Sequence, residues 1–285
     1  MANTRAIRQR IKGVENTSKI TKAMEMIASS KMRKAQERGL AGRPYAEKIN
    51  QVISNLAALK QMDGGMHPLL KKRSVNKISI IHITPDRGLS GGLDANLNRK
   101  TGAFILQQQV PVSLVTVGRR GIEYMRRFGR EIRAEFSNLG DKPGLIDTLP
   151  ISRIVIDDYC NGLVDMVFVV YAKFINTMRQ MPEIMQLLPV EPAESTKGQH
   201  SDYIFEPNPQ TVLDRLLPRF VESEIYHAVL ESIASEQSAR MVAMRNATQS
   251  AEELLEALTL AYYKARQESI TAELLDIVGG AAAIA

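Results

Sequence analysis

The chain has 285 residues and a single cysteine, Cys160, which excludes an internal disulfide framework. No run of about 18 apolar residues that could cross a membrane is present, since the longest Val-rich stretch, residues 164–172, has only the length of a strand, and the basic start lacks the apolar run of a secretory signal. The net charge of +6 is unevenly spread: residues 1–38 hold ten Lys or Arg and three Glu, whereas residues 221–285 hold ten acids and four bases. Opposite charges favour association of the two ends and leave a basic surface for an acidic partner.

The N-terminal region, residues 1–59, is expected to form one helix. It has no proline before Pro44 and few glycines. A stripe with steps of three and four residues gives this helix one weakly apolar face. The stripe consists of Ile7, Ile11, Val14, Thr17, Thr21, Met24, Ala28 and Met32.

The middle region, residues 75–209, alternates strand and helix signals. Such alternation predicts right-handed crossovers and a mainly parallel, Rossmann-like sheet. Residues 191–202 are polar and read as a loop. The expected strands are 77–84, 112–117, 132–136 and 166–171, with weaker ones at 184–188 and 203–205, and the expected helices are 95–109, 119–128 and 151–161.

The C-terminal region, residues 210–285, has no proline from Arg219 to its end and no glycine from Arg219 to Val278. Because residues 219–278 lack both of these helix-disfavouring residues, they are predicted to form one continuous helix, roughly 90 Å long at 1.5 Å per residue. Its slender side chains repeat with strict heptad spacing, which predicts a seam against a partner helix. The seam consists of Met241, Met244, Thr248, Ala251, Leu255, Leu258, Tyr262, Ala265, Ser269 and Ala272.

The fold class expected from these regions is α/β. A long antiparallel coiled coil of the N- and C-terminal helices accompanies a Rossmann-like α/β middle domain.

A glycine-rich loop at residues 86–92 follows the first expected strand. It matches neither GxxxxGK[ST] nor GxGxxG, so a nucleotide-dependent enzyme built on the middle domain is disfavoured. A tight exposed turn used for protein contact is the favoured interpretation.

The remaining polar residues give no catalytic, cofactor or metal site. The four histidines lack ligand spacing, and His82, inside an apolar strand, reads as a satisfied structural histidine. Cys160 reads as a small buried hydrophobe. Asp157 and Asp158 are adjacent on a helix and point in different directions, which favours a solvated face.

The basic N-terminal helix leaves two alternatives open. It can bind acidic protein loops, or the chain can be a coiled-coil scaffold or nucleic-acid-binding protein, although the basic run of residues 1–38 has no aromatic stacking residues. A salt-dependent affinity for random DNA would support the second alternative.

Several segments together resemble the gamma subunits of bacterial F-type rotary ATP synthases. The similarity covers essentially the whole chain, in family order. The segments are residues 1–8, 16–26 and 30–35 near the start, 86–92 in the middle, and 235–248 and 265–274 in the last helix.

The resemblance implies a non-catalytic subunit without cofactors that serves as the central rotor shaft. The shaft would transmit torque between the membrane c-ring and the catalytic alpha/beta head and regulate its activity. The implied partners are alpha, beta, epsilon and the c-ring, with one copy per complex and no nucleic acid. The implied place is peripheral, at the cytoplasmic face of a bacterial cell membrane, with indirect membrane association.

The resemblance also implies contact residues. By position, those expected to contact beta or alpha are Met24, Asp86, Arg87, Ser90, Arg266, Gln267, Thr271 and Glu273. Arg8, Lys12 and Arg33 form the expected basic face. The chain departs from the family pattern at Ser90, where many members have Cys, and at Tyr263, where Asn is common. A regulatory cysteine pair and a transit peptide are not seen.

Overall fold

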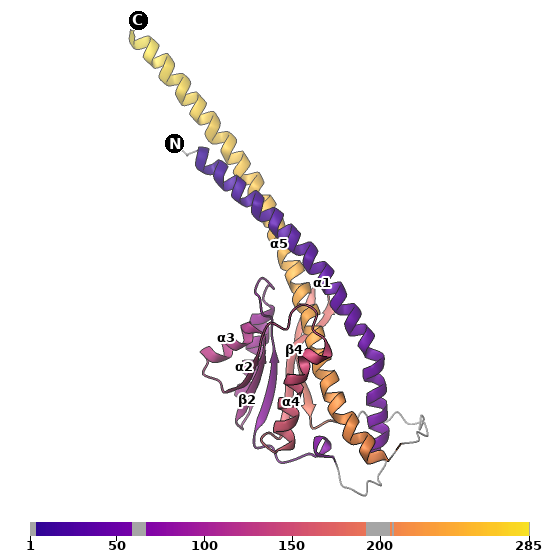
Figure 1. The fold of residues 1–285 in the computed structure, drawn as a ribbon. Coiled ribbons are helices and arrows are strands. Elements are labelled where there is room, and N and C mark those ends of the chain that lie inside the picture. The colour runs from indigo at the N-terminus through magenta and orange to yellow at the C-terminus, as the bar shows by residue number, and fades with distance from the viewer. Residues whose placement is uncertain (1–3, 59–66, 192–205, 207, 285) are drawn as a thin grey trace. The chain divides into compact units, whose positions relative to one another are not determined.

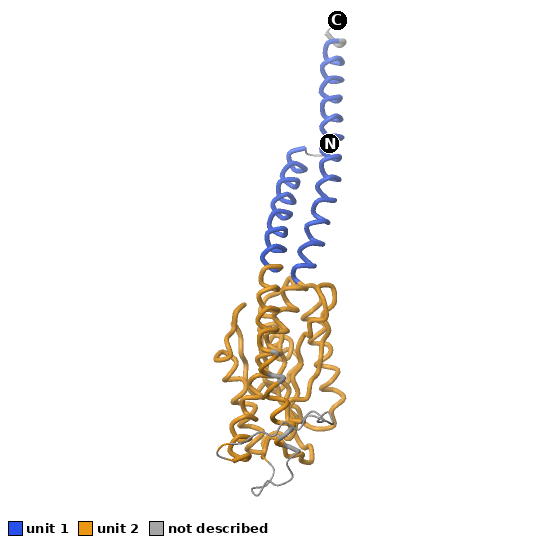
Figure 2. Tube along the Cα trace, turned by 90° about the vertical axis from the view of Figure 1, so that its right-hand side faces the viewer, with its two compact units in different colours: residues 1–28, 240–285 blue, residues 29–239 orange. Residues whose placement is uncertain are grey.

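The computed structural model describes residues 4–58, 67–191, 206 and 208–284. Long helices, α1 and α5, occupy the two ends of the chain, and a five-stranded sheet lies between them in sequence (Figure 1). The chain divides into two compact units (Figure 2). Unit 1 comprises Met1–Ala28 and Arg240–Ala285, and unit 2 comprises Ser29–Ala239. The predicted α/β class with long terminal helices is confirmed, while the sequence boundaries at 59, 75 and 209 stay a prediction.

Helix α1 spans Thr4–Ala58 and continues through Pro44. A proline inside a helix removes one backbone hydrogen bond, but Pro44 does not end α1. Packing of the last turns supports the helix here, because Ile49, Ile53 and Leu56 are buried in the core of unit 2.

Helix α5 spans Pro209–Ile284. Asn208 caps its start, since its side-chain oxygen accepts the Thr211 N–H at 2.8 Å, and Pro209 takes the first helical position, which does not need an N–H donor. The helix continues through Pro218 and through Gly279 and Gly280. It therefore begins earlier than the proline-free stretch suggested.

The sheet has the strand order β3-β2-β1-β4-β5. Its first four members pair in parallel, and β5 runs antiparallel to β4. The mainly parallel sheet is therefore confirmed. The strands are β1 Ile78–Ile83, β2 Val112–Val117, β3 Ile132–Phe136, β4 Met166–Asn176 and β5 Arg179–Leu188, and the shorter helices are η1 Pro68–Leu70, α2 Leu93–Gln107, α3 Arg119–Arg127 and α4 Leu145–Cys160.

Both faces of the sheet are covered, which explains why β1 is buried along its whole length. On one face, Ile81 and Ile83 join a core built with α4 and with the parts of α1 and α5 that belong to unit 2. On the other face, Ile78 and Ile80 pack with α2 and α3. Successive side chains of β1 therefore pack alternately into the two cores on either face of the sheet.

Some element boundaries differ from the sequence expectation. Strands β4 and β5 are longer than predicted because they pair with each other as a hairpin that extends beyond the Val-rich part of β4. Helix α4 begins six residues earlier than predicted, where the Asp147 carboxylate accepts the Gly144 N–H at 2.7 Å. The expected strand 203–205 and most of the expected loop 191–202 lie outside the described residues.

Two predictions about the end of α4 were wrong. Cys160 is exposed rather than buried, because it lies on the outer side of the last turn. Asp158 is buried, and the Arg133 guanidinium binds it through two hydrogen bonds of 3.2 and 3.3 Å. Only Asp157 lies on a solvated face.

The prediction for His82 is confirmed. The ring is fully buried, with Nε2 2.8 Å from the Asn98 side-chain oxygen and Nδ1 3.0 Å from the Thr101 hydroxyl. Burial lowers the pKa of His82 to about 4, so the ring is neutral at pH 7.

Candidate functional site

Unit 1 contains an antiparallel pair formed by the start of α1 and the last part of α5. The hydroxyls of Thr21 and Thr248 lie 2.8 Å apart, and four residues further along α1, Glu25 meets Arg245. Each predicted seam position of α5 is buried or half-buried, whereas the charged residues between them are exposed. The heptad seam of α5 is therefore confirmed.

The seam of α1 differs from its prediction at two positions. Ser18 is half-buried and Glu25 is 7% exposed, while Thr17 is exposed. A strict spacing of four and three from Ile7 leads to Ser18 and Glu25. The strict spacing therefore indicates the correct seam, but the less polar neighbours Thr17 and Met24 look more suitable for a buried position than Ser18 and Glu25.

Glu25 is held by a cation from each helix. Its carboxylate lies 3.0 Å from Lys22 Nζ on α1 and 2.9 Å from Arg245 Nε on α5. The hydrogen bond from Lys22, followed by that from Arg245, lowers the pKa of Glu25 below its usual range. The buried carboxylate is therefore ionised at neutral pH.

In this ion pair, each helix contributes a residue whose charge is opposite to the net charge of its own end of the chain. Glu25 is one of three acids in residues 1–38, and Arg245 is one of four bases in residues 221–285. Most of the basic residues of α1 are thus left for other contacts, and Arg8, Lys12 and Arg33 are all exposed.

The candidate contact residues of α5 face away from the seam. Arg266, Gln267, Thr271 and Glu273 are all exposed, and the Glu273 carboxylate accepts a 3.4 Å hydrogen bond from Ser269. Within the described residues, the Arg266 guanidinium has no hydrogen-bond or ion-pair partner. Met24, on α1, is half-buried beside the seam.

The loop between β1 and α2 turns two of its predicted contact residues inward. The Asp86 carboxylate accepts the backbone N–H groups of Arg119 at 3.0 Å and of Asn138 at 2.9 Å. Ser90 is 1% exposed. Asp86 thus caps the start of α3, a position where an anionic ligand would otherwise find backbone donors.

Two other residues of this loop have exposed side chains, and that of Arg87 also lines a cavity together with Glu236. Arg87 is exposed, and Leu89 is 61% exposed with a φ of 66°. A left-handed backbone costs a residue such as leucine about 1 kcal/mol. Leu89 could not be recognised from the sequence, because a positive φ leaves no signal in a leucine.

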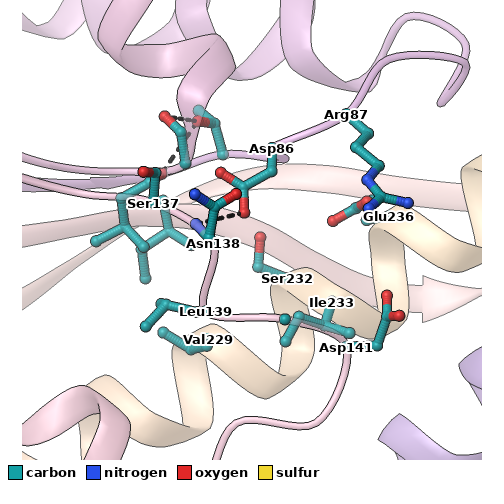
Figure 3. A pocket seen from close by; sticks show the side chains of 15 residues that line it. Asp86, Arg87, Ser137, Asn138, Leu139, Asp141, Val229, Ser232, Ile233 and Glu236 are labelled. Atoms are coloured by element: carbon teal, nitrogen blue, oxygen red, sulfur yellow. Dashed lines mark hydrogen bonds between the residues drawn. The ribbon is translucent and has the colours of Figure 1, made fainter.

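A cavity of about 310 Å³ lies at the carboxyl ends of β1 and β2 in unit 2 (Figure 3). Gly118 belongs to its wall, and an added Cβ there would lie 1.9 Å from the Thr84 carbonyl oxygen. Ligands of open α/β sheets commonly bind at this edge. Here the lining includes three carboxylates, those of Asp86, Asp141 and Glu236, and one guanidinium, that of Arg87, so its net charge is negative and would repel a phosphate.

Other site chemistry is limited in the part of the chain that the structure describes. There, no three His, Cys, Asp or Glu side chains gather into a group that could hold a metal ion. Across the same described ranges, no helix combines the length and the apolar character needed to span a membrane.

Comparison with known proteins identifies the family. The ATP synthase family profile matches residues 3–284. The ATP synthase gamma chain of Dehalococcoides mccartyi is 64% identical over 285 residues, covering all of both chains. That of Herpetosiphon aurantiacus is 46% identical over 294 residues, covering all of this chain and 99% of its own.

Solved structures agree. A chain of the Tetrahymena thermophila mitochondrial ATP synthase central stalk and c-ring is 25% identical, with a TM-score of 0.61 over 80% of this chain and 99% of that one. A rotor chain of Euglena gracilis mitochondrial ATP synthase shares the fold at 20% identity, with a TM-score of 0.65 over 94% of this chain and 98% of that one. The slender two-helix seam, the Rossmann-like sheet and the end-to-end similarity place this chain in the family of ATP synthase gamma chains.

Proposed function

We propose that the chain is the central rotor shaft of a proton-translocating ATP synthase. It carries torque between the membrane c-ring and the catalytic alpha/beta head. The observation that supports this most directly is the full-length identity of 64% to an ATP synthase gamma chain. The similar chain of the Tetrahymena thermophila central stalk supports the same role.

The surface chemistry of unit 1 suits a shaft that contacts equivalent sites of the alpha/beta head one after another as it rotates. Its seam is narrow and buries mainly small or slender side chains. The outside carries charged groups along both helices, and large apolar side chains are exposed among them, most densely at Leu274, Leu275, Ile277 and Val278 near the end of α5. Exposed charged contacts are individually worth about 1 kcal/mol or less, so each can be made and broken during a rotation.

The proposed contacts with the head come from the exposed side chains of unit 1. Arg266, Gln267, Thr271 and Glu273 on α5 would face beta or alpha, and Met24 on α1 would add a contact further along the shaft, level with Arg245. A guanidinium can donate several hydrogen bonds to a carboxylate or carbonyl of a neighbouring subunit.

The basic face and the loop would supply further contacts. Arg8, Lys12 and Arg33 would meet acidic loops of the head. In the loop of residues 86–92, Arg87 and Leu89 are placed to reach a partner. Asp86 and Ser90 would contribute by holding the shape of the loop from inside.

The subunit itself is proposed to be non-catalytic and free of cofactors. One copy per complex would associate with epsilon and the c-ring, influence the activity of the head, and attach to the membrane only through them. The proposed location is the cytoplasmic face of a bacterial cell membrane.

Co-purification tests the proposed function. The chain, expressed with alpha and beta, should form a stable ATPase with one copy per assembly, and should not hydrolyse ATP alone. Robust ATPase activity of the purified chain, or a failure to assemble with alpha and beta, would overturn the proposal.

The contact proposal has its own test in the variant Arg266→Ala with Gln267→Ala. Alanine is a good helix former, so α5 should stay helical by circular dichroism. Assembly or ATP synthesis should fall, since the contact with beta is lost. The matched control replaces the exposed Arg153 and Gln107 of unit 2 with alanine. Equal synthesis rates in both variants would show that Arg266 and Gln267 are merely solvated.

A further inference from the structure

The cavity at the carboxyl ends of β1 and β2 has an apolar side and a charged side. Figure 3 shows Leu139 and Val229 towards one side, and the carboxylates of Asp141 and Glu236 towards the other. The volume of about 310 Å³ lies at the lower end of the range in which proteins bind small organic molecules. A molecule that fits this cavity therefore has a short apolar body and a polar end.

The charged groups around the cavity carry a small net negative charge. The lining holds the three carboxylates of Asp86, Asp141 and Glu236, and the guanidinium of Arg87. A second cation, Lys31 of α1, places its Nζ 2.7 Å from the Asp141 carboxylate. Three carboxylates against these two cations favour a ligand with a single positive charge.

A buried hydroxyl gives independent evidence for a polar ligand. Ser232 of α5 lines the cavity and is only 4% exposed. Figure 3 shows its oxygen turned away from α5 and towards Asp86. Among the described residues, this hydroxyl finds no hydrogen-bond partner, whereas the Ser235 hydroxyl on the same helix donates to the Ala172 carbonyl at 2.9 Å. A buried hydroxyl without a partner is unfavourable, and a ligand in the cavity can supply the missing bond.

We infer that this cavity binds a small alkylammonium ion, an aliphatic chain that ends in an –NH3+ group. The aliphatic chain would pack against Leu139 and Val229, and the ammonium group would lie between Ser232 and Glu236. These two residues are four positions apart on α5, so they lie on one face of the helix, one turn apart. An ammonium group has three N–H donors and no acceptor, which suits a hydroxyl and carboxylates as its surroundings.

The contact between Lys31 and Asp141 shows the same chemistry at the rim of the cavity, where a carboxylate already accepts an ammonium group from this chain. Two sources could supply the ligand. One is a free aliphatic amine, and the other is the lysine side chain of a partner subunit. The inference concerns this chain alone and does not rest on the proposed function.

Isothermal titration calorimetry of the full chain tests the inference. The probes are pentylamine, pentanol and pentanoate, which share one hydrocarbon length and differ in the charge of the head group. We expect pentylamine to bind at one site with a dissociation constant roughly tenfold lower than that of pentanol, and pentanoate not to bind. Equal affinities for pentylamine and pentanol, or no saturable binding of pentylamine, would overturn the inference.

Variants of α5 locate the site. Ser232→Ala should weaken pentylamine binding several-fold while the thermal midpoint stays equal or rises, since a buried hydroxyl without a partner is removed. Glu236→Gln should also weaken binding several-fold. Ser223→Ala and Glu222→Gln are matched controls on the same helix outside the cavity lining, and both should keep the wild-type affinity. Wild-type affinity in both Ser232→Ala and Glu236→Gln would contradict the assignment of the ligand to this cavity.

A fourth probe, Nα-acetyl-lysine methylamide, distinguishes the two sources. Binding as tight as that of pentylamine would support a site for the lysine side chain of a partner. Binding roughly tenfold weaker would support a site for a free amine, because the backbone groups of the probe would then not fit. All of these measurements use the chain without other subunits, so their failure would leave the proposed rotor function standing.

Discussion

At the scale of single residues, hydrogen-bonded polar side chains connect the elements of unit 2. Asp86 joins the end of β1 to the start of α3 and to the loop after β3 through two backbone N–H groups. His82 joins β1 to α2 through Asn98 and Thr101. The role of His82 could be predicted, since a histidine inside an apolar strand must be satisfied. The role of Asp86 could not, because both of its donors lie far along the chain.

Replacing Asp86 should destabilise the fold rather than only weaken a partner contact. Asp86→Ala leaves the N–H groups of Arg119 and Asn138 without their acceptor, which should lower the free energy of unfolding by about 1–2 kcal/mol. Urea unfolding measures the change. Asp157→Ala, at an exposed carboxylate of α4, is the control and should stay within about 0.5 kcal/mol. Equal unfolding midpoints for the two variants would show that the Asp86 cap is unimportant.

Acid should destabilise unit 2 through His82. Its pKa of about 4 in the folded chain lies below the 6.5 of an unfolded histidine, so only the unfolded chain takes up this proton between those values. The stabilising effect is complete above pH 6.5 and is lost as the pH falls towards 4, by at most about 1.4 kcal/mol per pH unit. His82→Gln should flatten this slope in urea unfolding at pH 7, 6 and 5. An unchanged slope would exclude His82 as its source.

At the scale of elements, the sequence predicted best where a pattern is local. The α5 seam follows from spacing alone, and the strands β2 and β3 have the predicted bounds. The α1 seam was misread at Ser18 and Glu25 because a carboxylate becomes compatible with a seam only through Arg245, 220 residues away. Helices α1 and α5 pass through Pro44 and Pro218 for a similar reason, since tertiary packing outweighs the local penalty.

The narrow seam makes a prediction about side-chain size. Ala251 is 8% exposed, so Ala251→Phe should force the two helices of unit 1 apart and cost about 1–3 kcal/mol. Ala261→Phe carries the same change at an exposed position of α5 and should stay within about 0.5 kcal/mol. Thermal unfolding followed by circular dichroism compares the two. Equal midpoints would mean that the seam has room for a ring at this position.

At the scale of the whole molecule, the direction of the strands and the role of the chain could not be predicted equally well from the sequence. Alternating elements predicted a mainly parallel sheet, but the antiparallel direction of β5 depends on its hairpin with β4, which the alternation does not indicate. The shaft role followed from segments at both ends and in the middle of the chain, matched by relatives along their full length. Unit 2, with its Rossmann-like sheet, has a carboxyl edge lined by acids rather than by a phosphate cradle, which suits a structural module.

Rotation is the most direct test of the central claim. The chain has one cysteine, Cys160, and it is exposed, so a bead can be attached there in complexes whose alpha and beta subunits are fixed to a surface. On addition of ATP, the bead should turn in one direction through full revolutions, and it should stop when ATP is removed. A bead that stays still while the same complexes hydrolyse ATP would contradict the account of this chain as a rotating shaft.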